Sequence, residues 1–295
     1  MSPGQFFTRF GFFFLWLFHW LPLSVQAAAG NALGWLGYRL ARRRKRVARR
    51  NLELCFPEKS RAEIGRLARR NFQATTRASL EHGLLIWAPA ARLDKLIRIE
   101  GREHLDACRG LPVILLAPHF VGLDMGGVRL STEIRVASMY SRSRNPVLDH
   151  YLLKSRTRFT EAVLASRHEG IRPLIKTIQS GLPFYYLPDQ DQGLRESIFV
   201  PFFGIPAATI PALARLARVA GAKVLPAVTR QLPGGRGYVL KFYPAWENFP
   251  GGDVEADTRR MNAFIEERVL EMPEQYLWTH RRFKTRLEGE PSLYD

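Results

Sequence analysis

The chain has 295 residues, a formal net charge of +17 and a sequence pI near 10.5. Its 46% hydrophobic residues are enough for a real core, which excludes an extensively disordered protein and favours one large α/β domain or two small ones. The excess of positive charge favours an anionic partner: nucleic acid, an acidic protein or anionic lipid. The two cysteines, Cys55 and Cys108, form no CxxC motif or Cys/His cluster. We therefore expect no disulfide framework, no metal site and a reducing compartment.

Residues 1–50 are predicted to form a membrane anchor and a basic segment that follows it. No formally charged residue occurs from Phe10 to Tyr38, which is longer than the roughly 20 residues that a spanning helix needs. Pro22 interrupts this stretch, so a spanning helix followed by an interfacial one is an alternative. Arg39–Arg50 then carries eight basic residues and no acidic one. Such a cluster beside an apolar span marks the cytoplasmic side and attracts anionic lipid headgroups.

Two other interpretations of this terminus compete with the anchor. Arg9, the apolar stretch and Val25-Gln-Ala-Ala-Ala together are similar to a cleaved secretory signal, but the eight cations downstream would resist translocation. The basic run could also bind nucleic acid, yet no RNP pattern, zinc finger or helix-turn-helix pairing accompanies it. We therefore expect an anionic membrane surface, and no nucleic acid, as a partner.

Residues 51–295 are predicted to form one globular domain. Residues from about 52 to 95 have apolar positions at helical spacing, and Ser60 followed by Glu63 predicts a capping box. Beyond them, short apolar runs alternate with helical patterns, which indicates an α/β fold whose sheet is flanked by helices and carries its sites at strand ends. The predicted strands are 111–117, 134–140, 162–165, 184–187, 223–229 and 238–246. The predicted helices are 121–131, 146–158, 170–180, 209–221 (with Thr209 as N-cap) and 254–271.

A titratable pair follows the first predicted strand of this domain. The segment is LPVILLAPHFVGLDMGG, in which Pro118 ends the strand and His119 comes directly after it. Asp124 lies about 1.4 turns further along a helix that can begin at Phe120. We expect the Asp124 carboxylate to accept the Nδ1–H of His119 and to leave Nε2 as a general base. The alternative is a histidine that only caps a helix start, beside an unrelated surface aspartate.

The same residues indicate a reaction class. No GxSxG motif is present, and no activated serine or cysteine nucleophile is apparent. A histidine base without such a nucleophile would act on a hydroxyl that the substrate brings. This chemistry is typical of direct acyl transfer from a thioester to an alcohol, without an acyl-enzyme.

Several blocks of the sequence resemble a known family. HFVGLD resembles the His-x4-Asp motif of the glycerolipid acyltransferase superfamily, and the surrounding sequence is similar to the late (secondary) acyltransferases of bacterial lipid A synthesis, the lauroyl/myristoyl transferases. The resemblance covers nearly the whole chain, although Tyr140-Ser141 stands where members more often have Tyr-Arg. The blocks that carry it are SRSRNPVLDHYLLKSRTRF (141–159), LPDQDQGLRESIFVPFFGIPAAT (187–209) and PEQYLWTHRRFKTRLEGEPSLYD (273–295).

This resemblance implies a mixed sheet with flanking helices and an acyltransferase of lipopolysaccharide biosynthesis. The donor would be an acyl chain on acyl carrier protein, with no further cofactor. The acceptor would be the 3-hydroxyl of a hydroxyacyl chain on a lipid A precursor, a phosphorylated glucosamine disaccharide. The protein would act at the cytoplasmic side of the bacterial inner membrane. Both an acidic carrier protein and a phosphorylated lipid fit the positive charge of the chain.

His119 would deprotonate the acceptor hydroxyl, and the oxyanion that develops on the thioester carbonyl needs a positive group close by. Arg156 is our candidate, with Arg144, Asn145 and Arg158 as alternatives. Each of these arginines could also be simply solvated.

Further substrate-binding residues are expected in the later blocks. Asp189 and Asp191 follow a predicted strand and could orient the acceptor sugar or an arginine, although Asp189 fits a turn equally well. Phe202 could line an acyl groove, but aromatic residues at such spacing are more often core. Arg281 and Arg282 could bind phosphate or carrier protein, or could pair with surface acids.

Two other functions stay open at this point. One is acyl transfer to a glycerophospholipid or another membrane lipid, within the same superfamily. The other is a non-catalytic basic protein that binds membranes or nucleic acid.

Overall fold

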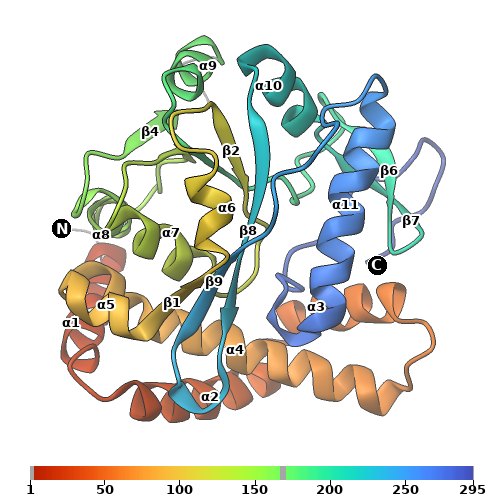
Figure 1. Cartoon of the computed structure of the whole chain (residues 1–295). Coiled ribbons are helices and arrows are strands. Elements are labelled where there is room, and N and C mark those ends of the chain that lie inside the picture. The colour runs from red at the N-terminus through yellow and green to blue at the C-terminus, as the bar shows by residue number, and fades with distance from the viewer. Residues whose placement is uncertain (1–2, 167–170, 295) are drawn as a thin grey trace.

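A seven-stranded sheet runs through the middle of the computed structural model, which describes residues 3–166 and 171–294 (Figure 1). The strand order is β1-β9-β8-β2-β5-β3-β4, and all neighbours are parallel except β8 and β9. The expected α/β fold with a mixed central sheet is therefore confirmed. The strands are β1 (Ile97–Glu100), β2 (Val113–Leu116), β3 (Ala137–Tyr140), β4 (Val163–Ser166), β5 (Phe184–Tyr186), β8 (Lys223–Gln231) and β9 (Tyr238–Phe242); β6 (Ile198–Phe202) and β7 (Ile205–Thr209) form a separate antiparallel pair.

Helices cover both faces of the sheet and bury its central strand. Every residue of β2 is buried, as its uninterrupted apolar sequence requires of a strand with a core on each side. Ile114 and Leu116 belong to the core shared with α3, α9, α10 and α11, whereas Val113 and Leu115 belong to the core shared with α5, α6 and α7. The helices are α3 (Arg42–Cys55), α5 (Ala90–Leu96), α6 (Arg102–Asp106), α7 (Leu123–Ser131), α8 (Pro146–Thr157), α9 (Arg172–Gln179), α10 (Ala212–Ala220) and α11 (Val254–Glu271), with 3₁₀ turns at Pro233–Gly235 and Pro273–Gln275.

The N-terminal helices α1 (Pro3–Phe18) and α2 (Leu23–Leu40) pack on the long helix α4 (Arg61–Trp87), below the sheet in Figure 1. Two glycines of α2 allow this close approach. A Cβ built on Gly30 would lie 2.6 Å from the Cα of Arg77, and one built on Gly34 would lie 2.5 Å from the Cα of Gln73. Larger side chains would therefore force the two helices apart.

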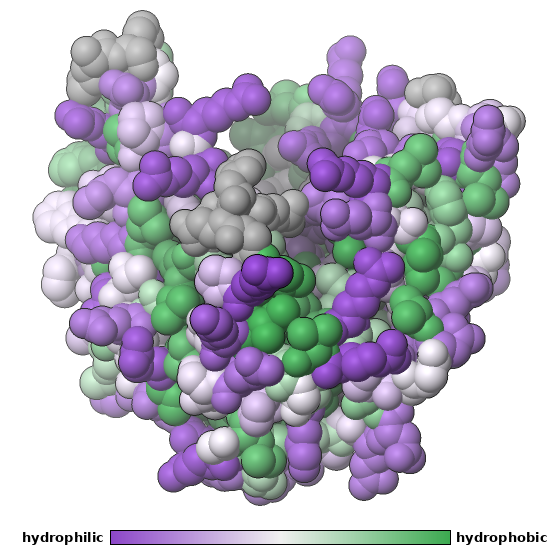
Figure 2. Space-filling model, turned by 90° about the horizontal axis from the view of Figure 1, so that it is seen from above, coloured by the Kyte–Doolittle hydropathy of each residue, from purple (hydrophilic) through white to green (hydrophobic). Residues whose placement is uncertain are grey.

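Large apolar side chains stay exposed on α1, α2 and the turn between them. Figure 2 shows the opposite end of the molecule, above α9 and α10, where hydrophilic side chains surround smaller apolar patches. Among the described residues, we find no helix with the length and apolarity needed to cross a membrane, so the expected spanning helix is not supported. Pro22 separates the apolar stretch into two shorter helices. The exposed residues are Phe6, Phe7, Phe10, Phe13, Phe14, Trp16, Leu17, Trp20, Leu21, Val25, Leu33, Trp35, Leu36 and Leu40.

Most predicted elements are present, with a few corrections. Ser60 and Glu63 form the predicted capping box at the start of α4. Thr209 is not the N-cap of α10, because it ends β7 and Pro211 holds the cap position. Strands β1, β6 and β7 were not predicted; β6 and β7 are too short and proline-rich to show a clear alternation. The predicted helix 170–180 starts at a position outside the described residues, and the division between 1–50 and 51–295 stays a prediction.

Candidate active site

His119 follows β2 directly and is held by a carboxylate from the neighbouring strand. Its Nδ1 donates to Asp189 Oδ1 at 2.7 Å, and its backbone N–H donates to the same carboxylate at 3.0 Å and 3.2 Å. Asp189 follows β5, the parallel neighbour of β2, so the carboxyl ends of two adjacent strands bring the pair together. An acceptor at Nδ1 fixes the tautomer of the ring and leaves Nε2 free to act as a base.

His119 and Asp189 interact strongly because both side chains are largely buried. The Asp189 side chain is 1% exposed and that of His119 is 19% exposed. Burial disfavours the imidazolium, but the charge and the hydrogen bond of Asp189, with Asp124 further away, outweigh it and raise the pKa of His119. Burial likewise opposes the charge of Asp189, but His119 and Arg282 outweigh it and lower the pKa of this carboxyl group. The carboxylate is therefore ionised and stabilises a proton on His119.

The predicted hydrogen bond between His119 and Asp124 is wrong. The segment after His119 does not enter a helix at once: Phe120 forms a β-bridge with Tyr276, a turn follows at Val121 and Gly122, and α7 begins only at Leu123. This geometry prevents the carboxylate of Asp124 from turning back onto Nδ1, a site that Asp189 takes instead. Asp124 accepts from Arg156 Nη2 on α8 at 3.5 Å, and its side chain is 46% exposed.

Asp124 nevertheless lies in the same cavity as His119. Burial opposes its charge, but His82, Arg156 and His119 outweigh this effect and lower the pKa of Asp124. Arg156, the predicted oxyanion-stabilising residue, therefore lies next to the predicted dyad, and its guanidinium also lies 5.5 Å from the ring centroid of Tyr140. The structure thus groups His119, Asp124 and Arg156 around one site, but with different contacts from those expected.

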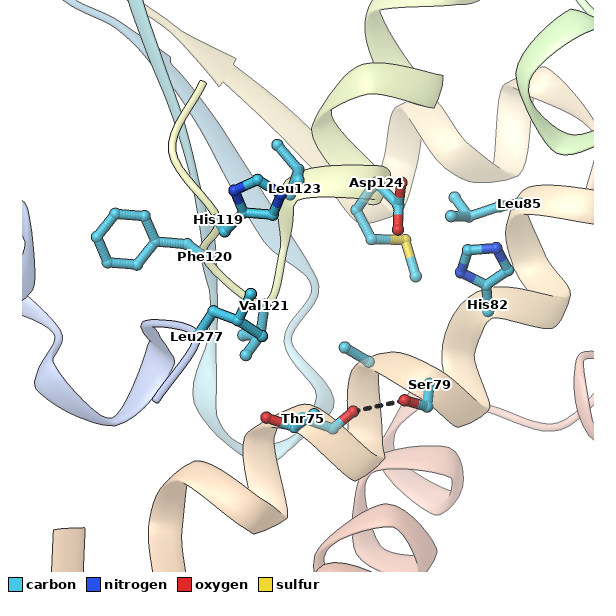
Figure 3. A pocket seen from close by; sticks show the side chains of 12 residues that line it. Thr75, Ser79, His82, Leu85, His119, Phe120, Val121, Leu123, Asp124 and Leu277 are labelled. Atoms are coloured by element: carbon cyan, nitrogen blue, oxygen red, sulfur yellow. Dashed lines mark hydrogen bonds between the residues drawn. The ribbon is translucent and has the colours of Figure 1, made fainter. Parts of the chain in front are cut away.

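This cavity has a volume of about 200 Å³ and lies between one face of α4 and the loop after β2 (Figure 3). Leu277 closes one side. In Figure 3 the His119 and Asp124 side chains come from above and those of α4 from below and from the side. The α4 residues recur at helical spacing and include two hydroxyl groups and an imidazole: Thr75, Ala78, Ser79, His82 and Leu85.

A second, narrower cavity of about 70 Å³ begins at the same carboxylate. Leu123 and Asp124 line both cavities, and Arg156 lines the second. Its inner wall comes from α7 and from strands β3, β4 and β5 and is mainly apolar: Gly127, Val128, Ser131, Val136, Ser138, Met139, Ala162, Leu164, Tyr185 and Leu187. The two cavities therefore share the wall formed by Leu123 and Asp124, and the catalytic candidates His119 and Arg156 each line one of them.

Three alternatives near α8 are placed differently. Asn145 is the N-cap of α8, since its Oδ1 accepts from the backbone of Val147 at 3.0 Å and its Nδ2 donates to Thr8 at 2.7 Å. Arg144 is exposed in the loop before this cap. Arg158 donates to the carbonyl of Ala88 and lines a different depression, so neither cavity at His119 contains it.

Asp191 and Phe202, predicted to bind substrate, have structural contacts instead. Asp191 is buried and accepts from the backbone N–H and the hydroxyl of Thr285, each at 2.7 Å. Phe202 is fully buried against Tyr276 and Phe283, so it belongs to the core and not to an acyl groove.

The two C-terminal arginines also differ from expectation. Arg282 is 2% exposed and donates to the carbonyl of Ala208 at 2.9 Å and to Thr209 at 2.8 Å, so it supports Asp189 by its charge and is not free to bind phosphate. Arg281 is partly exposed, 5.5 Å from the ring of Tyr294.

Sequence reasoning missed two features of this cavity: the hydrogen bond between Asp189 and His119, and the presence of His82 in the cavity wall. Asp189 carried a usable signal, because it follows a predicted strand in the same way as His119 does. His82 shares a helical face with Thr75 and Ser79, a polar stripe on an otherwise core-facing helix. Within residues 3–166 and 171–294, no group of three His, Cys, Asp or Glu side chains could hold a metal ion.

A histidine oriented by a carboxylate at a strand end of an α/β sheet, beside an apolar chamber, is an arrangement typical of enzymes that use a general base. The family of bacterial lipid A biosynthesis acyltransferases matches residues 1–285, and the chain belongs to this family. The protein is therefore an acyltransferase of lipid A biosynthesis.

Several lipid A acyltransferases are similar to this chain over most or all of its length. The lipid A biosynthesis lauroyltransferase of Escherichia coli (strain K12) is 34% identical over 297 residues, which cover 100% of this chain and 96% of the relative. The palmitoleoyltransferase of the same organism is 32% identical with the same coverage. Its myristoyltransferase is 32% identical over 288 residues, 92% of this chain and 89% of the relative.

Proposed function

We propose that this protein transfers a fatty acyl chain from acyl carrier protein to the hydroxyl of a hydroxyacyl chain on a lipid A precursor. The observation that carries the proposal is the His119–Asp189 pair at the wall of a cavity that shares Leu123 and Asp124 with a second, mainly apolar chamber. The base faces space for a polar acceptor, and the apolar chamber provides space for hydrocarbon. Family membership supports lipid A as the acceptor class.

In this mechanism, Nε2 of His119 takes the proton of the acceptor hydroxyl as its oxygen attacks the thioester carbonyl. The new C–O bond gives a tetrahedral oxyanion, and its collapse breaks the C–S bond. The imidazolium then returns its proton to the leaving thiolate, so the free thiol and the ester are the products. Asp189 stabilises the imidazolium throughout, which is consistent with the raised pKa of His119.

Arg156 is the residue proposed to stabilise the oxyanion. Support comes from its position in the wall of the second cavity, hydrogen-bonded to Asp124, which lines both cavities. Its guanidinium is half-exposed and held by one long hydrogen bond, so it can reorient toward a substrate oxygen.

The narrower chamber behind Asp124 and Arg156 is the proposed site of the transferred acyl chain. Its wall is apolar, and burial of one CH₂ group contributes about 0.8 kcal/mol. A chain bound there would place its thioester carbon beside Asp124, Arg156 and the His119 cavity.

We further propose that the protein works at the cytoplasmic side of the bacterial inner membrane, with α1 and α2 against anionic lipid. Support comes from their exposed aromatic and leucine side chains and from the basic segment Arg39–Arg50 next to them. Helix α4 lies between these helices and the cavity: residues of one of its faces contact α2, and residues of the opposite face line the site. A lipid acceptor could therefore reach His119 from the membrane surface.

The test is an in vitro assay of the full-length protein with a panel of acyl carrier protein thioesters and a tetra-acylated lipid A precursor, read by mass spectrometry. The expected product is a precursor with one additional acyl chain, and His119→Ala should not form it. A glycerophospholipid acceptor in a parallel reaction tests the alternative acyltransferase activity. Transfer to the glycerophospholipid alone would refute the proposed acceptor.

Membrane association needs its own measurement. The protein should sediment with vesicles that contain anionic lipid, and less with neutral vesicles or at high salt. Trp20→Ser, at a 67% exposed position, should weaken sedimentation, whereas Arg109→Ser, on an exposed loop next to α6, serves as the control. Equal binding by all three proteins would contradict the proposed surface.

A further inference from the structure

His82 is a second imidazole of the cavity, and the mechanism above does not use it. It lies on α4, opposite the loop that carries His119, and in Figure 3 its ring points toward the Asp124 carboxylate. Its Nε2 is buried and has no hydrogen-bond partner among the residues that the structure describes. A buried polar atom without a partner is destabilising, so its presence in a site calls for a functional reason.

Asp124 is the group that could satisfy this nitrogen. Asp124 is the acidic side chain that lines the cavity together with His82, and its charge raises the pKa of His82 against the effect of burial. Asp124 is itself only weakly bound, because its hydrogen bond from Arg156 is 3.5 Å long. A hydrogen bond from the Nε2–H of His82 to Asp124 would give both groups a charge-assisted partner.

The protonation states allow this bond. Burial disfavours the charged form of His82 and lowers its pKa. The negative charge of Asp124 acts in the opposite direction but is outweighed, and the positive charge of Arg156 acts in the same direction as burial. The groups that face it are Asp124 on α7, Arg156 on α8 and, further away, His119 after β2. A neutral imidazole with its proton on Nε2 can donate to the ionised Asp124.

We propose that His82 is a positioning residue: its Nε2–H donates to Asp124 and holds this carboxylate at the junction of the two cavities. This proposal rests on the proposed function, since Asp124 matters for catalysis only if acyl transfer occurs there. His82 acts through Asp124 and does not touch the reacting atoms. The two carboxylates of the site then each have an imidazole partner, Asp189 with His119 and Asp124 with His82.

The kinetic test is a double-mutant cycle with His82→Leu and Asp124→Asn. His82→Leu should lower kcat about 10- to 100-fold, as expected for the loss of one hydrogen bond to a charged group, and leave KM within about twofold. The double variant should be no less active than the weaker single variant, because both changes remove the same interaction. Additive losses, or a loss confined to KM, would overturn the proposal. His104→Leu, on α6, is the control and should keep wild-type activity.

Two further variants keep the test decisive if His82→Leu does not fold. The amide nitrogen of Gln reaches the position of Nε2, whereas that of Asn reaches only the position of Nδ1. His82→Gln should therefore restore most of the activity and His82→Asn should not. Equal activity of the two variants would refute the role of Nε2.

One readout separates this inference from the proposed function. In histidine-labelled protein, NMR titration of the His82 ring should give a lower pKa in Asp124→Asn than in the wild type, because the carboxylate favours the imidazolium. This shift without any acyl transfer by the wild type would refute the proposed function and leave the pair intact. Acyl transfer with no such shift would overturn the pair.

Discussion

The carboxylates of Asp189 and Asp124 both act on His119, but the protein holds them in different ways. Asp189 is almost fully buried and accepts hydrogen bonds from both the ring and the backbone of His119. Asp124 is 46% exposed, at the junction of two cavities, with one long bond to Arg156. The first arrangement fixes a ring in place before substrate arrives, and the second can respond to substrate. In the proposed mechanism, the tightly bound carboxylate of Asp189 would orient the base, whereas the exposed one of Asp124 would serve the reacting groups.

Removal of the histidine that the two carboxylates share should have the largest effect. His119→Ala leaves no base for the acceptor hydroxyl, and we expect kcat to fall about 100- to 10 000-fold. Acyl transfer to the lipid A precursor, followed by mass spectrometry, measures this loss. His104→Ala is the matched control on α6. Full activity of His119→Ala would eliminate the general-base mechanism and with it the contrast between the carboxylates.

Asp189→Asn tests the role of the buried carboxylate. An asparagine keeps the shape but loses the charge that stabilises the imidazolium, and it can present an N–H to Nδ1 and favour the wrong tautomer. We expect kcat to fall about 100- to 1000-fold, measured in the same assay.

The control for this change is Asp257→Asn, another buried aspartate that accepts a backbone N–H, from Gly251 at 2.8 Å. It should lower the melting temperature without a comparable loss of kcat. If both variants lost activity only in proportion to their stability, Asp189 would have a structural role alone.

Asp124→Asn tests the role of the exposed carboxylate and should have a smaller effect on kcat than Asp189→Asn. His119 keeps its partner and tautomer, so only the longer-range charge and the contact with Arg156 are lost. We expect kcat to fall about tenfold to 100-fold. Asp106→Asn, an exposed aspartate paired with Arg109, is the control. A loss larger than that of Asp189→Asn would reverse the assignment of the two carboxylates.

The contrast also shows how far sequence reasoning reaches. The alternation of strands and helices, the capping box at Ser60 and the position of His119 directly after a strand all depend on local pattern, and the structure places them as predicted. Asp189 lies 70 residues from His119 and meets it only because β5 and β2 are parallel neighbours, a pairing that spacing along the chain does not contain.

The failed predictions have a related cause. Asp124 was expected to bind Nδ1 because a helix starting at Phe120 would turn it back, but the bridge between Phe120 and Tyr276 delays the helix to Leu123. Phe202 and Arg282 occur in distinctive sequence blocks, and the core explains both, since Arg282 lies 5.2 Å from the Phe202 ring and holds the carbonyl of Ala208. A distinctive sequence block can therefore contain core residues as readily as residues of a binding site.

The pH dependence should show the smallest and most discriminating difference. His119 must be neutral to accept a proton, so kcat/KM should rise with pH as the imidazolium loses its proton. Since Asp189, and to a smaller degree Asp124, raise the pKa of His119, this rise should occur above the ordinary histidine value of about 6.5 in the wild type. This rise of kcat/KM should move to lower pH in Asp124→Asn, and to still lower pH in the residual activity of Asp189→Asn. In each variant, less negative charge near His119 remains to oppose the effect of burial on its pKa. Profiles of kcat/KM from about pH 5 to pH 9 measure the order, with Asp106→Asn as the unshifted reference. Coincident profiles would mean that neither charge controls the base, whereas a larger shift in Asp124→Asn would make the exposed carboxylate the principal partner of His119.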